Sequence, residues 1–213
     1  CSDGGVFETI TTEPVCCASD MDPRAFPQFS VAHPTPSTTG MLRMIDLSHP
    51  DLGRILRYPK ITLFMDGTFS VVSKPFSQCL IVMAYEPAVD LYLPICYVLV
   101  QNKSQETYWR VLNELIILSN RQLEPQNVTC DFEVALINPF VQFPRANLVG
   151  CLFHWKQALR RKMVDLRIPE DQIKHALSSG KLDTLTLIPV DEIRKKGIRY
   201  VRSLIDESRA KGK

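Results

Sequence analysis

Ile61-Thr62-Leu63-Phe64-Met65-Asp66-Gly67-Thr68-Phe69 is the stretch that decides the fold of this chain. Its first residues are mostly β-branched or apolar, as is typical of a buried strand, and an acid, a glycine and a threonine follow where the strand should leave the core. A carboxylate beside so much apolar surface is costly to desolvate unless a cation or hydrogen-bond donors meet it. Asp66 is therefore the first candidate functional residue.

Two apolar segments after this stretch, at residues 78–85 and 91–100, read as further strands. The short connection between them favours an antiparallel hairpin, so we expect a meander of three strands. The preceding residues 1–59 are expected to flank this core as loop and extended chain. Within that flank we predict one strand near Phe26–Val31 and a short helix between Met41 and Tyr58.

A helix should follow the meander, because Ser104 can cap it and apolar residues recur on one of its faces. A short strand at 127–130, a short helix at 135–141 and a further strand at 147–153 complete the series. An antiparallel meander followed by crossover units is the RNase H-like order. We therefore predict an α/β fold with a mixed sheet, antiparallel in its first three strands and parallel beyond them, flanked by helices.

Charge is distributed unevenly along the 213 residues. Residues 1–154 hold 10 Lys+Arg against 15 Asp+Glu, a formal charge of −5, whereas residues 155–213 hold 15 against 8, a charge of +7. We expect the RNase H-like core at residues 60–155. The basic region 156–213 should be helical, the start of an insertion, and is suited to meet a polyanion.

The cysteine content indicates an intracellular protein with reduced thiols. Seven cysteines are an odd number, and four of them lie inside apolar segments, a pattern that suits buried thiols better than a disulfide framework. No apolar run approaches the roughly 18 residues of a membrane span, so we expect a soluble protein without a membrane partner. Because the chain begins with Cys1 rather than Met, we expect it to be a piece of a longer product.

Asp131 leaves the fourth predicted strand as Asp66 leaves the first. These two strands are neighbours in an RNase H-like sheet, so the two carboxylates should meet, and like charges at that distance repel unless a divalent cation lies between them. Mg²⁺ or Mn²⁺ prefers such oxygen ligands together with substrate phosphates. Two such ions can activate a nucleophile and stabilise the leaving oxygen of a phosphodiester.

Each acid also has a purely structural interpretation. An Asp before Gly is commonly a turn residue, and Asp131 could cap the helix that follows it. Glu133 either points at the site or pairs with a surface base. The equivalent positions of Asp66 and Asp131 at two strand ends favour the functional interpretation.

Two further features lie just beyond the fifth predicted strand. Cys151 and His154 are spaced as zinc ligands, but two ligands do not close a tetrahedral site, and burial in the fold is an equal alternative. The basic run after them suits contact with a DNA backbone, although a solvated helix face would explain it equally well. The residues of that run with this candidate role are Lys156, Arg160, Arg161 and Lys162.

Three segments, in order, resemble the motifs of Mutator-like element (MULE) transposase domains, most of all the type associated with FLYWCH zinc fingers. They are Asp66-Gly67-Thr68-Phe69, Cys130-Asp131-Phe132-Glu133 and the stretch from Gly150 to Ala158, GCLFHWKQA. By this resemblance, Asp66 and Asp131 match the first two acids of a DDE triad, and Cys151 and His154 match the Cys-x-x-His element of the family.

The resemblance implies a nuclear DNA transposase that cuts and joins double-stranded DNA at transposon ends and targets, with homo-oligomers expected. The third acid of the family, a Glu, lies beyond a helical insertion after the Cys-x-x-His element. Only 59 residues follow His154, and none of the later glutamates stands in a matching context. The alternative is a transposase-derived DNA-binding or interaction protein that has lost catalysis.

Overall fold

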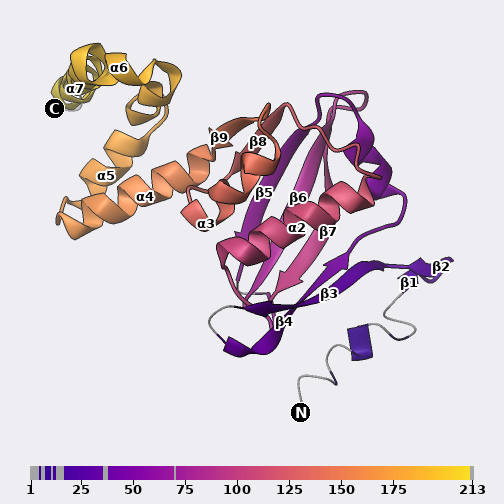
Figure 1. Ribbon diagram of the computed structural model, residues 1–213. Helices are drawn as coiled ribbons and strands as arrows, with labels where there is room; N and C mark the ends of the chain where they lie inside the picture. Colours follow the sequence, from indigo (N-terminus) through magenta and orange to yellow (C-terminus); the bar gives the residue numbers. More distant parts are fainter. Residues whose placement is uncertain are drawn as a thin grey trace. The chain divides into compact units, whose positions relative to one another are not determined.

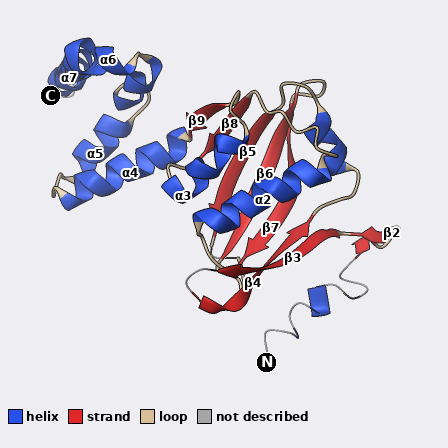
Figure 2. Cartoon of the chain, in the orientation of Figure 1, coloured by secondary structure: helices blue, strands red, loops and turns tan. Residues whose placement is uncertain are grey.

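The chain divides into two compact units, Cys1–Gly150 and Cys151–Lys213. The first contains a large sheet with helices packed on it, and the second is helical (Figures 1 and 2). The residues that this computed structural model describes are 5, 8–10, 12, 17–35, 38–69 and 71–211.

Within the described residues, the main sheet of the first unit has seven strands, which are β3 (Pro27–Thr35), β4 (Thr38–Leu47), β5 (Thr62–Thr68), β6 (Gln78–Glu86), β7 (Leu91–Val100), β8 (Asn127–Cys130) and β9 (Asn147–Gly150). Their spatial order is β3-β4-β7-β6-β5-β8-β9. Pairing is antiparallel from β3 to β5, and β8 is parallel to both β5 and β9. The predicted mixed sheet, antiparallel in the meander and parallel beyond it, is confirmed.

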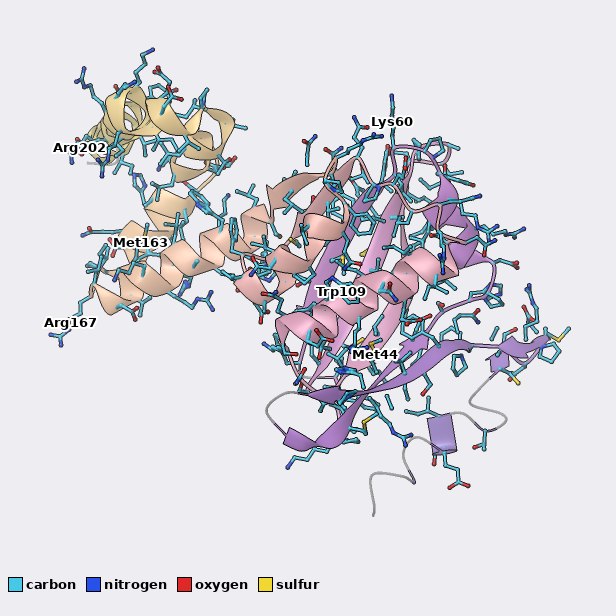
Figure 3. All side chains as sticks on the ribbon, viewed as in Figure 1. Met44, Lys60, Trp109, Met163, Arg167 and Arg202 are labelled. Carbon is cyan, nitrogen blue, oxygen red and sulfur yellow. The ribbon has the colours of Figure 1, made fainter. Side chains whose placement is uncertain are left out.

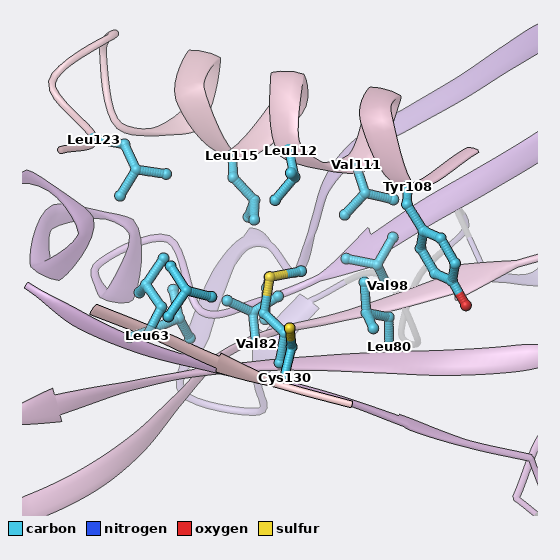
Figure 4. Close-up of a cluster of buried hydrophobic side chains, with 14 of the residues drawn as sticks. Leu63, Leu80, Val82, Val98, Tyr108, Val111, Leu112, Leu115, Leu123 and Cys130 are labelled. Atoms are coloured by element: carbon cyan, nitrogen blue, oxygen red, sulfur yellow. The ribbon is translucent and has the colours of Figure 1, made fainter. Parts of the chain in front are cut away.

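Helix α2 (Gln105–Leu118) packs on one face of this sheet and closes the core. Its N-cap is Ser104, as predicted, and the Ser104 hydroxyl accepts a hydrogen bond from the Thr107 backbone N–H at 3.2 Å. Figure 4 shows the labelled side chains of α2 pointing onto those of the strands, among them Leu112 above the sheet and Cys130 within it. This packing fixes which side chains of each strand face inward.

Strand β5 shows that alternation most clearly. Leu63 and Met65 are buried under α2, whereas Phe64 lies on the opposite face, where its ring contacts Tyr92 at 5.1 Å between centroids. Successive side chains of a strand point to opposite faces, so residue 66 belongs to the same face as Phe64. The core thus determines on which side the first acid lies.

The helix predicted between Met41 and Tyr58 is wrong in its first half. Residues 41–47 continue β4, which pairs with β7, and only Leu52–Arg57 is helical, as the 3₁₀ helix η1. Met44 and Ile45 are both fully buried, in two different apolar clusters on opposite faces of the sheet. Burial on both faces explains why β4 lacks the alternation that would have marked it as a strand.

Other boundaries differ less from prediction. The strands at 78–85, 91–100 and 127–130 are confirmed. The helix predicted at 135–141 is α3 (Val134–Ile137) followed by the 3₁₀ helix η2 (Asn138–Gln142), because Pro139 lacks the amide hydrogen that an α-helix would need. The last predicted strand ends at Gly150 rather than residue 153.

The second unit consists of α4 (Leu152–Asp165), α5 (Glu170–Leu177), the 3₁₀ helix η3 (Leu182–Leu187), α6 (Val190–Glu192), the π-helix η4 (Ile193–Gly197) and α7 (Ile198–Lys211). Ile173 and Val201 are its buried apolar residues among those described. In the first unit, β1 (Cys17–Ser19) and β2 (Asp22–Ala25) form a separate antiparallel pair.

The five described cysteines are free thiols, which are Cys17, Cys79, Cys96, Cys130 and Cys151; Cys1 and Cys16 lie outside the described residues. None of the described helices combines the length and the apolar character that crossing a membrane requires.

Candidate functional site

The parallel ladder between β5 and β8 brings the two predicted acids together. Met65 lies opposite Cys130, so Asp66 and Asp131, one residue further along each strand, are lateral neighbours. Neighbouring strands are about 4.8 Å apart. Met65 and Cys130 are both buried toward α2, so alternation within β5 places Asp66 on the opposite face of the sheet, and Asp131 is the first residue after β8.

Backbone amides orient both carboxylates. Asp66 Oδ1 accepts a hydrogen bond from the Gly67 backbone N–H at 2.8 Å, and Asp131 Oδ1 accepts one from the Phe132 N–H at 2.6 Å. Asp66 is exposed and Asp131 is half-buried. The same local bond in both strands gives the two carboxylates equivalent positions.

Neither structural alternative for these acids describes what is observed. Asp66 and Gly67 lie within β5, not in a turn. The N-cap of α3 is Glu133, so Asp131 does not cap that helix. The positions of the two acids are set by the sheet rather than by a turn or a helix end.

Glu133 belongs to a different set of contacts. Its Oε2 lies 3.3 Å from the Tyr108 hydroxyl, which donates to Gln78 Oε1 at 2.8 Å. Burial raises the pKa of Tyr108, and the negative charge of Glu133 raises it further, so the hydroxyl stays protonated as a donor. Among the described residues, Glu133 therefore forms no ion pair with a base and belongs to no metal-binding group with the two acids. Within the described residues, no three His, Cys, Asp or Glu side chains gather as a metal site.

Gln78 and Tyr108 are the residues near this edge that sequence reasoning missed. The available signal was a glutamine opening an otherwise apolar strand, QCLIVMAY. Gln78 packs so closely under β5 that a Cβ on Gly67 would come within 1.5 Å of its Nε2. A larger residue at position 67 would therefore displace the Gln78 amide.

Two carboxylates are a sufficient protein contribution to a magnesium site. Mg²⁺ commonly keeps several waters and binds through one or two carboxylates and the phosphates of a substrate. Asp66, which is exposed, and Asp131, which is half-buried, supply carboxylates from neighbouring strands and fit this requirement. The arrangement suits a hard divalent cation that a phosphate-bearing substrate also contacts.

Cys151 and His154 lie at the start of α4. Cys151 is its N-cap residue and His154 belongs to its first turn, so the strand predicted through residue 153 gives way to helix here. The part of the chain that the structure describes offers no third ligand to group with them. Zinc at this pair has no support beyond the spacing of the two residues.

The basic residues of α4 divide into two kinds. Lys156 Nζ lies 3.4 Å from Asp183 Oδ2, and Arg160 forms a bidentate ion pair with Glu170 at 2.9 Å. Burial opposes ionisation of Asp183, but hydrogen bonds from backbone amides and the Lys156 ammonium outweigh it and lower its pKa. Both bases are therefore engaged in ion pairs within the second unit.

Arg161 and Lys162 are exposed, and within the described residues no hydrogen bond or ion pair engages their side chains. Of the four residues predicted to contact DNA, Arg161 and Lys162 are thus the two whose side chains form no ion pair with the described residues. Their role in DNA binding stays a prediction.

Neither the known protein families nor the curated proteins include a match to this chain. Among solved structures, the HTLV-2 integrase catalytic core domain in complex with magnesium (dimeric form) is weakly similar. The match covers 56% of this chain and 83% of the integrase domain, with 15% sequence identity and a TM-score of 0.28. The magnesium and the dimer belong to that protein.

Proposed function

We propose that this chain is the catalytic core of a MULE-type DNA transposase with an RNase H-like fold. The observation that carries the proposal is that Asp66 and Asp131 each come one residue after a paired position, Met65 and Cys130, of neighbouring parallel strands. The strand order β7-β6-β5-β8-β9 supports it, because a three-stranded meander followed by two parallel strands is the order expected of that fold. Nuclear location and action on transposon ends belong to the same proposal.

In this proposal, the two carboxylates hold divalent ions against a DNA phosphate. Such ions, when bound, activate the attacking oxygen and stabilise the leaving oxygen of the phosphodiester. The backbone amides of Gly67 and Phe132 fix the carboxylate oxygens, so little reorganisation is needed on binding. Exposed Arg161 and Lys162 would contact the DNA backbone.

The third acid of the triad is not assigned. Glu170 is bound to Arg160 and Glu192 to Lys196, at 2.9 Å and 2.8 Å. Both glutamates therefore serve ion pairs in the second unit. The second candidate function, a transposase-derived DNA-binding protein without catalysis, is favoured by one observation: within the described residues, no third ligand joins the acid pair.

A cleavage assay separates the two functions. Plasmid DNA is incubated with the protein and Mn²⁺, and nicked products are measured for the wild type, Asp66→Asn and Asp131→Asn. Catalysis predicts a loss of roughly a thousandfold in each variant, because the ions supply several kcal/mol of transition-state stabilisation.

The matched control is Asp171→Asn, which makes the same change at an exposed acid of α5 and should leave cleavage intact. Cleavage that is unchanged in Asp66→Asn would exclude the assignment. DNA binding without cleavage in the wild type would favour the second candidate function.

A further inference from the structure

A groove of about 770 Å³ opens at the other end of the parallel strands, where β5, β8 and β9 begin. Its volume lies within the roughly 300–1,000 Å³ of small-molecule sites in proteins. All of its lining residues belong to the first unit. Lys60, labelled in Figure 3, marks this end of the sheet. The groove is distinct from the acid pair, which lies where β5 and β8 end.

Three proline-containing segments line the groove, which are Pro59-Lys60, Glu124-Pro125-Gln126 and Phe143-Pro144-Arg145. The ring of proline fixes φ, which limits backbone freedom. The segments are also joined by backbone bonds: Gln126 N–H donates to the Ile61 carbonyl at 2.9 Å, and Asn147 N–H to the Gln126 carbonyl at 2.8 Å. The walls of the groove are therefore held in place before any ligand arrives, which favours binding.

The inner wall of the groove is apolar. Leu123 and Phe143 are buried at its base, and Ile116, from the end of α2, contributes a partly buried side chain. Together with the flat faces of the prolines, they form a surface suited to an aromatic ring.

The rim of the groove carries an excess of positive charge. Lys60 and Arg145 line it from different segments, and Glu124 is the acidic lining residue. All three are exposed, and among the described residues no hydrogen bond or ion pair engages their side chains. An anion with several oxygens would gain charge-assisted hydrogen bonds from both cations.

The φ of Lys60 is 58°, and among the described non-glycine residues Asp90, Asn120, Arg121 and Arg167 also have a positive φ. A residue other than glycine is disfavoured in this left-handed region, and such residues cluster at binding sites.

We propose that the groove binds a small aromatic phosphate. The phosphate lies between Lys60 and Arg145, and the ring lies against Phe143 and the prolines. The inference does not depend on the acid pair, and it stands whether or not the chain is a transposase.

Calorimetric titration with phenyl phosphate tests the proposal. The wild type should bind it with one site per chain and more tightly than inorganic phosphate or benzyl alcohol, because only phenyl phosphate uses both the rim and the wall. Lys60→Gly and Arg145→Ala should each weaken binding roughly tenfold. Lys60→Gly suits the left-handed backbone, so its effect reports on the charge rather than on folding.

Two further variants sharpen the test. Glu124→Gln removes the rim acid and should tighten binding about twofold to threefold. Lys174→Ala removes an exposed cation of the second unit and should leave binding unchanged. Equal binding by the wild type and Lys60→Gly would overturn the proposal. Binding of a short single-stranded oligonucleotide at Lys60 and Arg145, with none of phenyl phosphate, would also overturn it and assign the groove to nucleic acid.

Discussion

The two ends of the parallel strands carry opposite chemistry. Asp66 and Asp131 lie near the ends of the neighbouring strands β5 and β8, whereas Lys60 and Arg145 line a groove where these strands begin. Asp66 lies within β5 and Asp131 directly follows β8, so the register between these two strands sets the spacing of the two acids. The cations belong to proline-containing segments between elements.

This difference shows how one sheet can hold two independent sites. A change in the packing beneath β5 should disturb the acid end and leave the groove intact. A change in the proline-containing segments should do the reverse. A third acid of the sheet, Asp46, differs from both ends because it is buried.

Asp46 of β4 provides the largest expected effect. It is fully buried, and burial raises its pKa to about 7, although a hydrogen bond from the Ser48 hydroxyl at 2.7 Å partly offsets the shift. Between about pH 4 and pH 7 the folded state then binds more protons than the unfolded state. Asp46 should therefore lower the free energy of unfolding by about 1.4 kcal/mol for each pH unit of increase in this window.

Urea denaturation between pH 4 and pH 8 measures this contribution. Asp46→Asn should be more stable relative to the wild type as pH rises, with the difference levelling off above about pH 7. A difference between the two proteins that is independent of pH would show that Asp46 ionises normally.

Gly67→Ala should disturb the acid end alone. The new Cβ would collide with the amide of Gln78, and overpacking of this kind costs about 1–3 kcal/mol. Thermal unfolding measures the loss, and Gly67→Ala combined with Gln78→Ala should recover part of it. Phenyl phosphate binding in the groove should persist in Gly67→Ala, and its loss would show that the two ends are coupled.

Tyr108→Phe tests the contacts behind the acid end. The change removes the donor to Gln78 Oε1 and leaves two acceptors, on Gln78 and Glu133, without it, at an expected cost of about 1–2 kcal/mol. Tyr85→Phe is the control, because its hydroxyl bonds Asp90 at an exposed site and should contribute less. If Tyr108→Phe and Tyr85→Phe lowered the free energy of unfolding equally in chemical denaturation, the Tyr108 hydroxyl would contribute no more to stability than an exposed hydroxyl.

Lys60→Gly should change the free energy of unfolding least, and it should raise that free energy rather than lower it. Glycine adopts a φ of 58° without a Cβ penalty, while its greater freedom in the unfolded chain offsets part of the gain. We expect stabilisation of roughly 0.5 kcal/mol in chemical denaturation. If Lys60→Gly lowered the free energy of unfolding, the lysine side chain would support the fold. In that case Arg145→Ala would be the variant that tests the contribution of charge to ligand binding.

The strands that carry the two acids were predictable because their apolar residues lie close together in sequence. Asp66 lies within β5 and Asp131 directly follows β8, and a parallel ladder makes these two strands neighbours. Strand β4 was not predictable, because burial on both of its faces hides its period and one of its two partners, β7, lies some fifty residues away.

The remaining contacts depend on residues far apart in sequence. The Tyr108 hydroxyl contacts Gln78, which is 30 residues away in sequence, and Glu133, which is 25 residues away. The groove combines three segments that no periodic pattern connects. Sequence patterns report which face of an element is apolar, but not which side chains of other elements meet it.

A Mn²⁺ titration by calorimetry tests the central claim most directly. The wild type is compared with the double variant Asp66→Asn/Asp131→Asn, which keeps the shape of both side chains and removes their charge. If the two acids form a metal site, the wild type should bind Mn²⁺ and the double variant should not. Equal binding by both proteins, or none by the wild type, would contradict the claim.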